Sequence, residues 1–202
     1  MTGGARATTP PIPWSAGRWT NTPAAVEERG GDLLVTAAAE SDAWRHTSYG
    51  FVHDTENALI APFSPGWAME VEYTAAFSEL FDQAGLFIRA RDDVWVKAAT
   101  EFSDGQLSAG AVVTHGRSDW SLSPASDWLG KRVLIRASWS GGAITIRGGI
   151  AGEPLRLLRV LPFEDADSVE AGPLVCAPTR AGLVVPFHAW RVTAADASLH
   201  GQ

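Results

Sequence analysis

Apolar and polar residues alternate along most of this chain in short runs, separated by glycine, proline, aspartate and serine. Strict alternation is typical of a β-strand with one face in the core, because successive side chains point to opposite sides of the backbone. In residues 67–77, the apolar side chains from Trp67 to Phe77 share one face, whereas Glu70 and Glu72 share the other. We expect a core face and a water-facing face, with both glutamates on the latter.

The same reasoning predicts a hairpin and further strands. Residues 132–140 alternate, the pair Gly141-Gly142 provides the positive φ angles of a tight turn, and residues 144–146 resume the pattern. Other runs with strand character are 32–37, 82–91, 94–102, 107–114, 155–161, 170–176 and 183–192. About ten to fourteen strands without helical periodicity predict an all-β fold of two packed antiparallel sheets.

The length of 202 residues suits one large β-sandwich, and no linker is long enough to divide the chain. We expect a single domain over residues 14–202. Residues 1–13, rich in glycine, threonine and proline, are expected to be loosely ordered. They lack the apolar stretch of a signal peptide, so a cytoplasmic location is the default expectation.

Charge and composition exclude several classes of function. The net charge of −7 argues against a duplex nucleic-acid binder, which needs a basic face. No apolar stretch approaches the roughly 20 residues that span a bilayer. The single cysteine, Cys176, excludes an internal disulfide and lies in an apolar run typical of a buried, inert thiol. The five histidines have no paired spacing, and glycine-rich nucleotide motifs are missing, so we expect neither a metal site nor a cofactor.

The segment 94–102 places an aromatic side chain and two opposite charges on one face of a strand. By parity Trp95, Lys97, Ala99 and Glu101 point one way, while residues such as Val96 point into the core. Lys97 and Glu101 lie about 13 Å apart along the strand, too far for an ion pair, so each needs a partner from another strand or from a ligand. The small Ala99 between them leaves an open floor. We predict an exposed groove here; a solvated face with scattered charges is the alternative.

A second candidate follows Gly116. Ser118, Asp119 and Ser121 surround Trp120, and short polar groups beside an aromatic ring suit a sugar, which stacks on the ring and donates hydrogen bonds. A local turn stabilised by these side chains is the alternative. The Gly-x-Ser beginning is not a serine-hydrolase elbow, because the elbow's second glycine is missing.

Two further segments pair acidic or amide groups with aromatic residues. Asp82 and Gln83 follow Phe81 at the start of a predicted strand, and Asp42 precedes Trp44. Each is weak alone, because Asp42 could cap a turn and Trp44 could belong to the core.

These segments appear together in a family pattern. The motifs are Asp42-Ala43-Trp44, Phe81-Asp82-Gln83-Ala84-Gly85-Leu86, Trp95-Val96-Lys97 with Glu101, Ser118-Asp119-Trp120-Ser121, and the segment from Gly172 to Pro178. In this order they resemble a concanavalin A-like domain family of unknown function that includes the "regulation of enolase" type proteins. The Asp-Gln-Ala-Gly-Leu segment is also similar to one in sandwich domains appended to some β-xylosidases. The resemblance implies a jelly-roll sandwich whose concave sheet, in distant relatives, binds or cleaves glycans. Ala43 stands where the family has an aromatic residue.

Three functions follow as hypotheses. The first is binding of a carbohydrate or other small polar ligand on the concave sheet. The second is interaction with a protein, including a homodimer that buries Trp95 and Trp120. The third is a glycoside-active enzyme using Glu101 with Asp82 or Asp119, which requires carboxyl groups about 5–5.5 Å or 6.5–9.5 Å apart. The expected ligand-binding residues are Trp44, Asp82, Gln83, Trp95, Lys97, Glu101, Ser118, Asp119 and Trp120.

Overall fold

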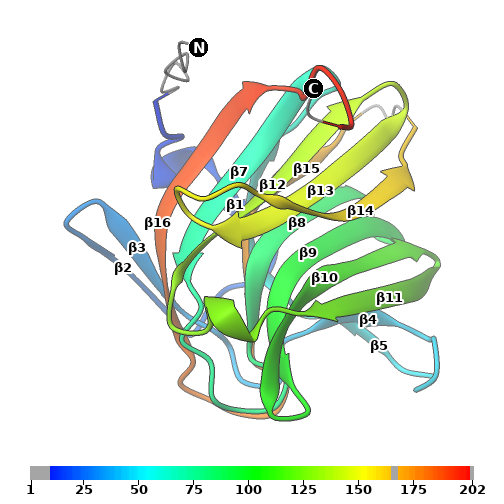
Figure 1. The fold of residues 1–202 in the computed structure, drawn as a ribbon. Coiled ribbons are helices and arrows are strands. Elements are labelled where there is room, and N and C mark those ends of the chain that lie inside the picture. The colour runs from blue at the N-terminus through cyan, green and yellow to red at the C-terminus, as the bar shows by residue number, and fades with distance from the viewer. Residues whose placement is uncertain (1–9, 165–167, 201–202) are drawn as a thin grey trace.

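The computed structural model describes residues 10–164 and 168–200 and confirms the two-sheet antiparallel sandwich (Figure 1). Most of the segment expected to be loosely ordered, residues 1–9, lies outside the described residues. Its last part, residues 10–13, runs along the second of the two sheets, where the backbone N–H of Ile12 donates to the carbonyl of Trp190 at 2.6 Å. No helix within residues 10–164 and 168–200 is long and apolar enough to cross a membrane.

Each of the two large sheets has seven strands. The first, which we call the pocket sheet, consists in spatial order of β1 (Arg18–Trp19), β6 (Asn57–Pro62), β15 (Glu170–Cys176), β8 (Gln83–Arg91), β9 (Val94–Ser103), β10 (Gln106–His115) and β11 (Arg117–Pro124). The second consists of β14 (Arg156–Pro162), β13 (Ala143–Ile150), β12 (Arg132–Ser140), β7 (Trp67–Thr74), β16 (Val184–Ala194), β3 (Asp32–Thr36) and β2 (Ala25–Arg29). A separate hairpin of β4 (Ala43–Arg45) and β5 (Val52–Asp54) and two 3₁₀ helices, η1 (Trp14–Ala16) and η2 (Ser126–Trp128), complete the described elements.

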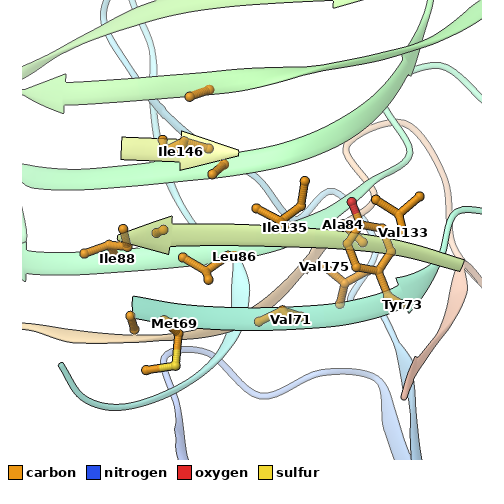
Figure 2. Packing of buried hydrophobic residues seen from close by; sticks show 14 of the residues in the cluster. Met69, Val71, Tyr73, Ala84, Leu86, Ile88, Val133, Ile135, Ile146 and Val175 are labelled. Carbon is orange, nitrogen blue, oxygen red and sulfur yellow. The ribbon is translucent and has the colours of Figure 1, made fainter. Parts of the chain in front are cut away.

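The main core lies between the two sheets. Met69, Val71 and Tyr73 of β7 belong to the same buried cluster as Leu86 and Ile88 of β8 in the pocket sheet, and all five are fully buried (Figure 2). The alternation in residues 67–77 therefore predicted the core face correctly from Met69 to Phe77, whereas Trp67 at its start is 49% exposed. The hairpin of β12 and β13 is also confirmed, with both turn glycines at positive φ.

The opposite face of β7 is not simply water-facing, as expected. Glu70 is buried, and its Oε1 accepts a hydrogen bond from Nη1 of Arg136 at 2.6 Å. Glu72 accepts from Arg132 at 2.8 Å and from Arg191 at 2.5 Å. Arginines on the neighbouring strands β12 and β16 thus cover both glutamates, which sequence spacing within one strand could not show.

The outer face of the pocket sheet carries a second, smaller core. Its buried members are Ala43, Trp44, Ala58, Ile60, Phe87, Trp95, Val112, Leu174 and Cys176. Two of these, Ala43 and Trp44, come from the β4–β5 hairpin. Strand β4 of this hairpin contacts β10 and β11, and the hairpin lies below β11 in Figure 1. This hairpin closes part of a face that would otherwise be open to solvent, and it forms one wall of the pocket described next.

Candidate functional site

A pocket of about 390 Å³ lies on the outer face of the pocket sheet, beside the β4–β5 hairpin. Strands β8, β9 and β10 supply its floor, and the hairpin supplies one wall. The residues that line it are Glu40, Asp42, Trp44, Tyr49, Phe51, His53, Phe81, Gln83, Lys97, Glu101, Val112, Trp120, Pro178 and Thr179. One side is therefore aromatic, whereas the floor is polar.

The floor is built by Gln83, Lys97 and Glu101. Strand parity turns Lys97 and Glu101 outward because their neighbours Val96 and Ala98 belong to the main core. Gln83 on β8 lies directly opposite Glu101 on β9 in the antiparallel register. These polar side chains are almost completely enclosed, at 2%, 3% and 7% exposure respectively. The exposed groove that the sequence predicted is thus a deep pocket.

Lys97 finds its partner in Asp42, which precedes β4. Nζ of Lys97 lies 2.7 Å from Oδ1 of Asp42, and the same oxygen accepts a hydrogen bond from the backbone N–H of Ala43 at 2.8 Å. Nε2 of Gln83 approaches that oxygen at 3.5 Å. Burial opposes the charge of Lys97, but the carboxylate of Asp42, together with the nearby Glu101, raises the pKa of Lys97. Lys97 is therefore a cation held within the protein.

Glu101 is the chemically adjustable group of the floor. Burial raises its pKa to about 7, although the nearby charge of Lys97 opposes the increase. Its Oε1 is buried and has no hydrogen-bond partner among the residues that the structure describes, and the same is true of Oε1 of Gln83. Glu101 can consequently hold or release a proton near neutral pH, and the floor offers two unused acceptor atoms.

The wall opposite this floor is a cluster of aromatic rings. The ring of Trp44 lies edge-on to Tyr49 at 5.7 Å and to Trp120 at 5.9 Å. Tyr49 stacks on Phe51 with centroids 5.3 Å apart, and Phe51 meets His53 edge-on at 4.5 Å. Tyr49, Phe51 and Trp120 remain exposed, so ring surface is accessible from the pocket.

Ser118 fixes the hairpin to the sheet instead of lining the pocket. Its Oγ accepts the backbone N–H of Arg45 at 2.9 Å and is hydrogen-bonded to Oγ1 of Thr114 at 2.9 Å. Its carbonyl accepts a hydrogen bond from Thr47 at 2.5 Å. The segment is not the local turn considered from the sequence: it belongs to the edge strand β11, from which Trp120 lines the pocket.

Strand parity also separates Asp119 from Trp120. Trp120 lies opposite Val112, on the pocket side, whereas Asp119 lies opposite Val113, whose side chain belongs to the main core. Asp119 instead pairs with Arg159 of the second sheet at 2.9 Å. The pocket receives the ring without the neighbouring carboxylate.

Asp82 and Trp95 also lie outside the pocket. Arg180 binds both carboxylate oxygens of Asp82, at 2.8 and 2.6 Å, and the backbone N–H groups of Ser78 and Glu79 donate to it at 3.1 Å. Burial disfavours this charge, yet these donors hold the pKa of Asp82 below its ordinary value. Trp95 is only 2% exposed and packs against Phe87. It faces a separate hollow of about 190 Å³.

The pocket thus brings together five of the nine expected ligand-binding residues: Trp44, Gln83, Lys97, Glu101 and Trp120. The carboxylates considered as catalytic partners of Glu101, Asp82 and Asp119, do not line it. Asp42 does, and it was not among the expected site residues. The signal that could have found it was the need of Lys97 for a partner, combined with the position of Asp42 next to Trp44. Within the described residues, no three His, Cys, Asp or Glu side chains form a group that could hold a metal ion.

Comparisons with known proteins agree on the family. Residues 19–195 match the family model described as "Protein of unknown function (DUF1349)". "Regulation of enolase protein 1" of Saccharomyces cerevisiae is 32% identical over 180 residues, which cover 89% of this chain and 90% of that protein. A crystal structure of a functionally unknown protein from Saccharomyces cerevisiae superposes with a TM-score of 0.84 at 32% identity, covering 91% of this chain and 98% of that one.

More distant structures share the fold alone. A mutant of the GH43 protein BlXynB from Bacillus licheniformis aligns with a TM-score of 0.71 at 12% identity, over 89% of this chain and 37% of that one. A xylan β-1,4-xylosidase from Bacillus halodurans aligns with a TM-score of 0.62 at 14% identity, over 82% of this chain and 33% of that one. The family model covers most of the chain, and the yeast relative matches nearly end to end, so this chain belongs to the DUF1349 family of proteins of unknown function.

Proposed function

We propose that this protein binds a carbohydrate or another small polyol in the pocket beside the β4–β5 hairpin. The observation that carries the proposal is the pair of buried, unpartnered acceptors, Oε1 of Gln83 and Oε1 of Glu101, on side chains that line the pocket. Burying a polar atom without a hydrogen bond costs about 1–3 kcal/mol, so such atoms indicate a missing donor. Sugar hydroxyls are donors of the required kind.

The aromatic wall supports the same ligand class. The rings of Tyr49, Phe51 and Trp120 offer apolar faces, and the floor opposite them offers hydrogen-bond acceptors. A sugar ring has a hydroxyl-rich edge and a less polar face, and therefore matches both sides at once. The volume of about 390 Å³ lies within the range of small-molecule sites, about 300–1,000 Å³.

The fold also occurs in proteins whose names refer to polysaccharides. One is the xylan β-1,4-xylosidase from Bacillus halodurans, of which this chain spans a third. Another is an alginate lyase from Klebsiella pneumoniae, with a TM-score of 0.55 at 11% identity and 83% coverage of each chain. At such identities the likeness concerns the fold, and it supports the ligand class only together with the pocket.

Titration with a panel of mono- and oligosaccharides, followed by tryptophan fluorescence and calorimetry, tests the proposal. Trp120→Ala should weaken binding about tenfold, the effect of losing one good ring contact. Trp67→Ala is the matched control, because Trp67 is 49% exposed, as against 40% for Trp120, but lies on the second sheet. The proposal fails if no saccharide binds, or if both variants bind like the unmodified protein.

A second candidate is acid–base chemistry on the bound sugar. A general acid or base works best with a pKa near the working pH, and burial gives Glu101 a pKa of about 7. Asp42 is the nearby carboxylate that lines the same pocket. Incubation with aryl glycosides, comparing the unmodified protein with Glu101→Gln, tests this candidate. Turnover that survives Glu101→Gln would refute the assignment.

A further inference from the structure

The pocket contains a marked imbalance between hydrogen-bond donors and acceptors. Two of its side-chain donors are engaged inside the protein: Nε1 of Trp44 donates to the carbonyl of Thr47 at 2.9 Å, and Oγ1 of Thr179 donates to the carbonyl of Leu80 at 2.6 Å. Within residues 10–164 and 168–200, no group donates to the acceptors Oε1 of Gln83 and Oε1 of Glu101. A ligand that fits this pocket must bring donors.

The cationic side chains in and beside the pocket already have anionic partners within the protein. Among the described residues, the one lysine or arginine that lines the pocket is Lys97, which Asp42 neutralises at 2.7 Å. Arg180, adjacent in sequence to the lining residue Thr179, donates from Nε and Nη2 to the two carboxylate oxygens of Asp82. Both cations thus already have a carboxylate of the protein as their partner.

Two carboxyl groups of the pocket have no cationic partner of their own. Within the described residues, neither Glu40 on the rim nor Glu101 on the floor takes part in an ion pair within 4.0 Å. A buried carboxylate without a partner is costly, and a cation that enters its site removes much of that cost. The rings of Trp44 and Tyr49 nearby would further favour a cation over an anion, because aromatic faces attract positive charge.

We infer that the pocket selects a sugar carrying a protonated amine, as an amino sugar does, and rejects uronates and sugar phosphates. The ammonium group bonds to Glu101 and to Oε1 of Gln83, while the ring rests against the aromatic wall. This inference depends on the proposed saccharide binding and adds a specificity to it. Glu101 is the residue that determines the specificity.

Calorimetric titration with D-glucosamine, D-glucose and D-glucuronate at about pH 7, where amines remain largely protonated, provides the test. Glucosamine should bind at least about tenfold more tightly than glucose, the effect of one partly buried, charge-assisted contact, and glucuronate at least about tenfold more weakly. In Glu101→Gln, glucosamine and glucose should bind equally. Glu153→Gln, an exposed carboxylate in the turn between β13 and β14, is the control and should keep the preference.

The outcomes separate the two proposals. If none of these sugars and no saccharide of the panel binds, the proposed function falls, and the specificity falls with it. If glucose binds as tightly as glucosamine, or glucuronate binds best, saccharide binding stands and the inference is overturned. The same holds if Glu101→Gln keeps the preference for the amine, because the selectivity would then arise elsewhere.

Discussion

Replacing Glu101 by glutamine should stabilise the protein at neutral and alkaline pH and leave its stability nearly unchanged at acidic pH. Burial raises the pKa of Glu101 from its ordinary 4.5 to about 7, so the folded protein holds this proton more tightly than the unfolded chain. The stability that the proton provides is complete below about pH 4.5 and is lost as the pH rises through about 7. Glutamine is a neutral group of the same shape and loses nothing over this range.

The size of the effect follows from the pKa. A pKa that stands about 2.5 above its ordinary value, at about 1.4 kcal/mol for each whole unit, corresponds to about 3 kcal/mol. At pH 8, Glu101→Gln should therefore unfold with a free energy about 3 kcal/mol higher than the unmodified protein. Below about pH 4.5 the two proteins should have nearly equal stability.

Urea unfolding followed by tryptophan fluorescence, at a series of pH values from about 4.5 to 8, measures this difference. Glu40→Gln is the control: Glu40 is an exposed carboxylate on the rim of the same pocket, so its replacement should change stability by less than about 0.5 kcal/mol at every pH. A stability difference for Glu101→Gln that stays constant with pH, or that makes the variant less stable at pH 8, would refute the reasoning.

Three further changes probe the architecture around the pocket. Asp42→Ala leaves the ammonium of Lys97 buried without its partner and should cost about 3 kcal/mol in chemical denaturation; a loss below about 1 kcal/mol would contradict the buried pair. Gly85→Ala places a Cβ 2.1 Å from the carbonyl oxygen of Ala98 and should cost at least about 2 kcal/mol, so an unchanged Tm would show that the strands separate easily. Arg136→Met breaks a buried ion pair on the second sheet and should cost about 3 kcal/mol while leaving ligand affinity in the pocket unchanged; a weakened affinity would mean that the two sheets are coupled.

Alternation along the chain predicted the long strands and their core faces well. The face of β7 with Met69 and Val71, and the hairpin at Gly141-Gly142, follow directly from a period of two and from the backbone freedom of glycine. Six strands were not predicted, namely β2, β6 and β11 and the short strands β1, β4 and β5. Segments of two or three residues carry too little periodicity to be recognised, and their extended shape depends on the neighbours with which they pair.

The candidate site was predictable in part for the same reason. Parity placed Lys97 and Glu101 on one face, and the distance between them correctly implied that Lys97 needed a partner from elsewhere. The sequence around Asp119 and Trp120 was equally compatible with a turn. Parity therefore could not show that both residues belong to a strand and point to opposite faces. Nor could it show that Arg180, far along the chain, engages Asp82.

The alternating pattern and the length were sufficient to indicate an all-β sandwich, and the alternation also indicated the side of β9 on which chemistry could occur, because the alternation follows from local backbone geometry. Whether that side would be open or enclosed depended on the β4–β5 hairpin, which brings Asp42 and Trp44 onto it. Burial is a property of the packed chain, not of a strand. Packing of the hairpin brings Asp42 to Lys97 as its ion-pair partner, and burial raises the pKa of Glu101. The face that was predicted to be exposed is therefore a pocket.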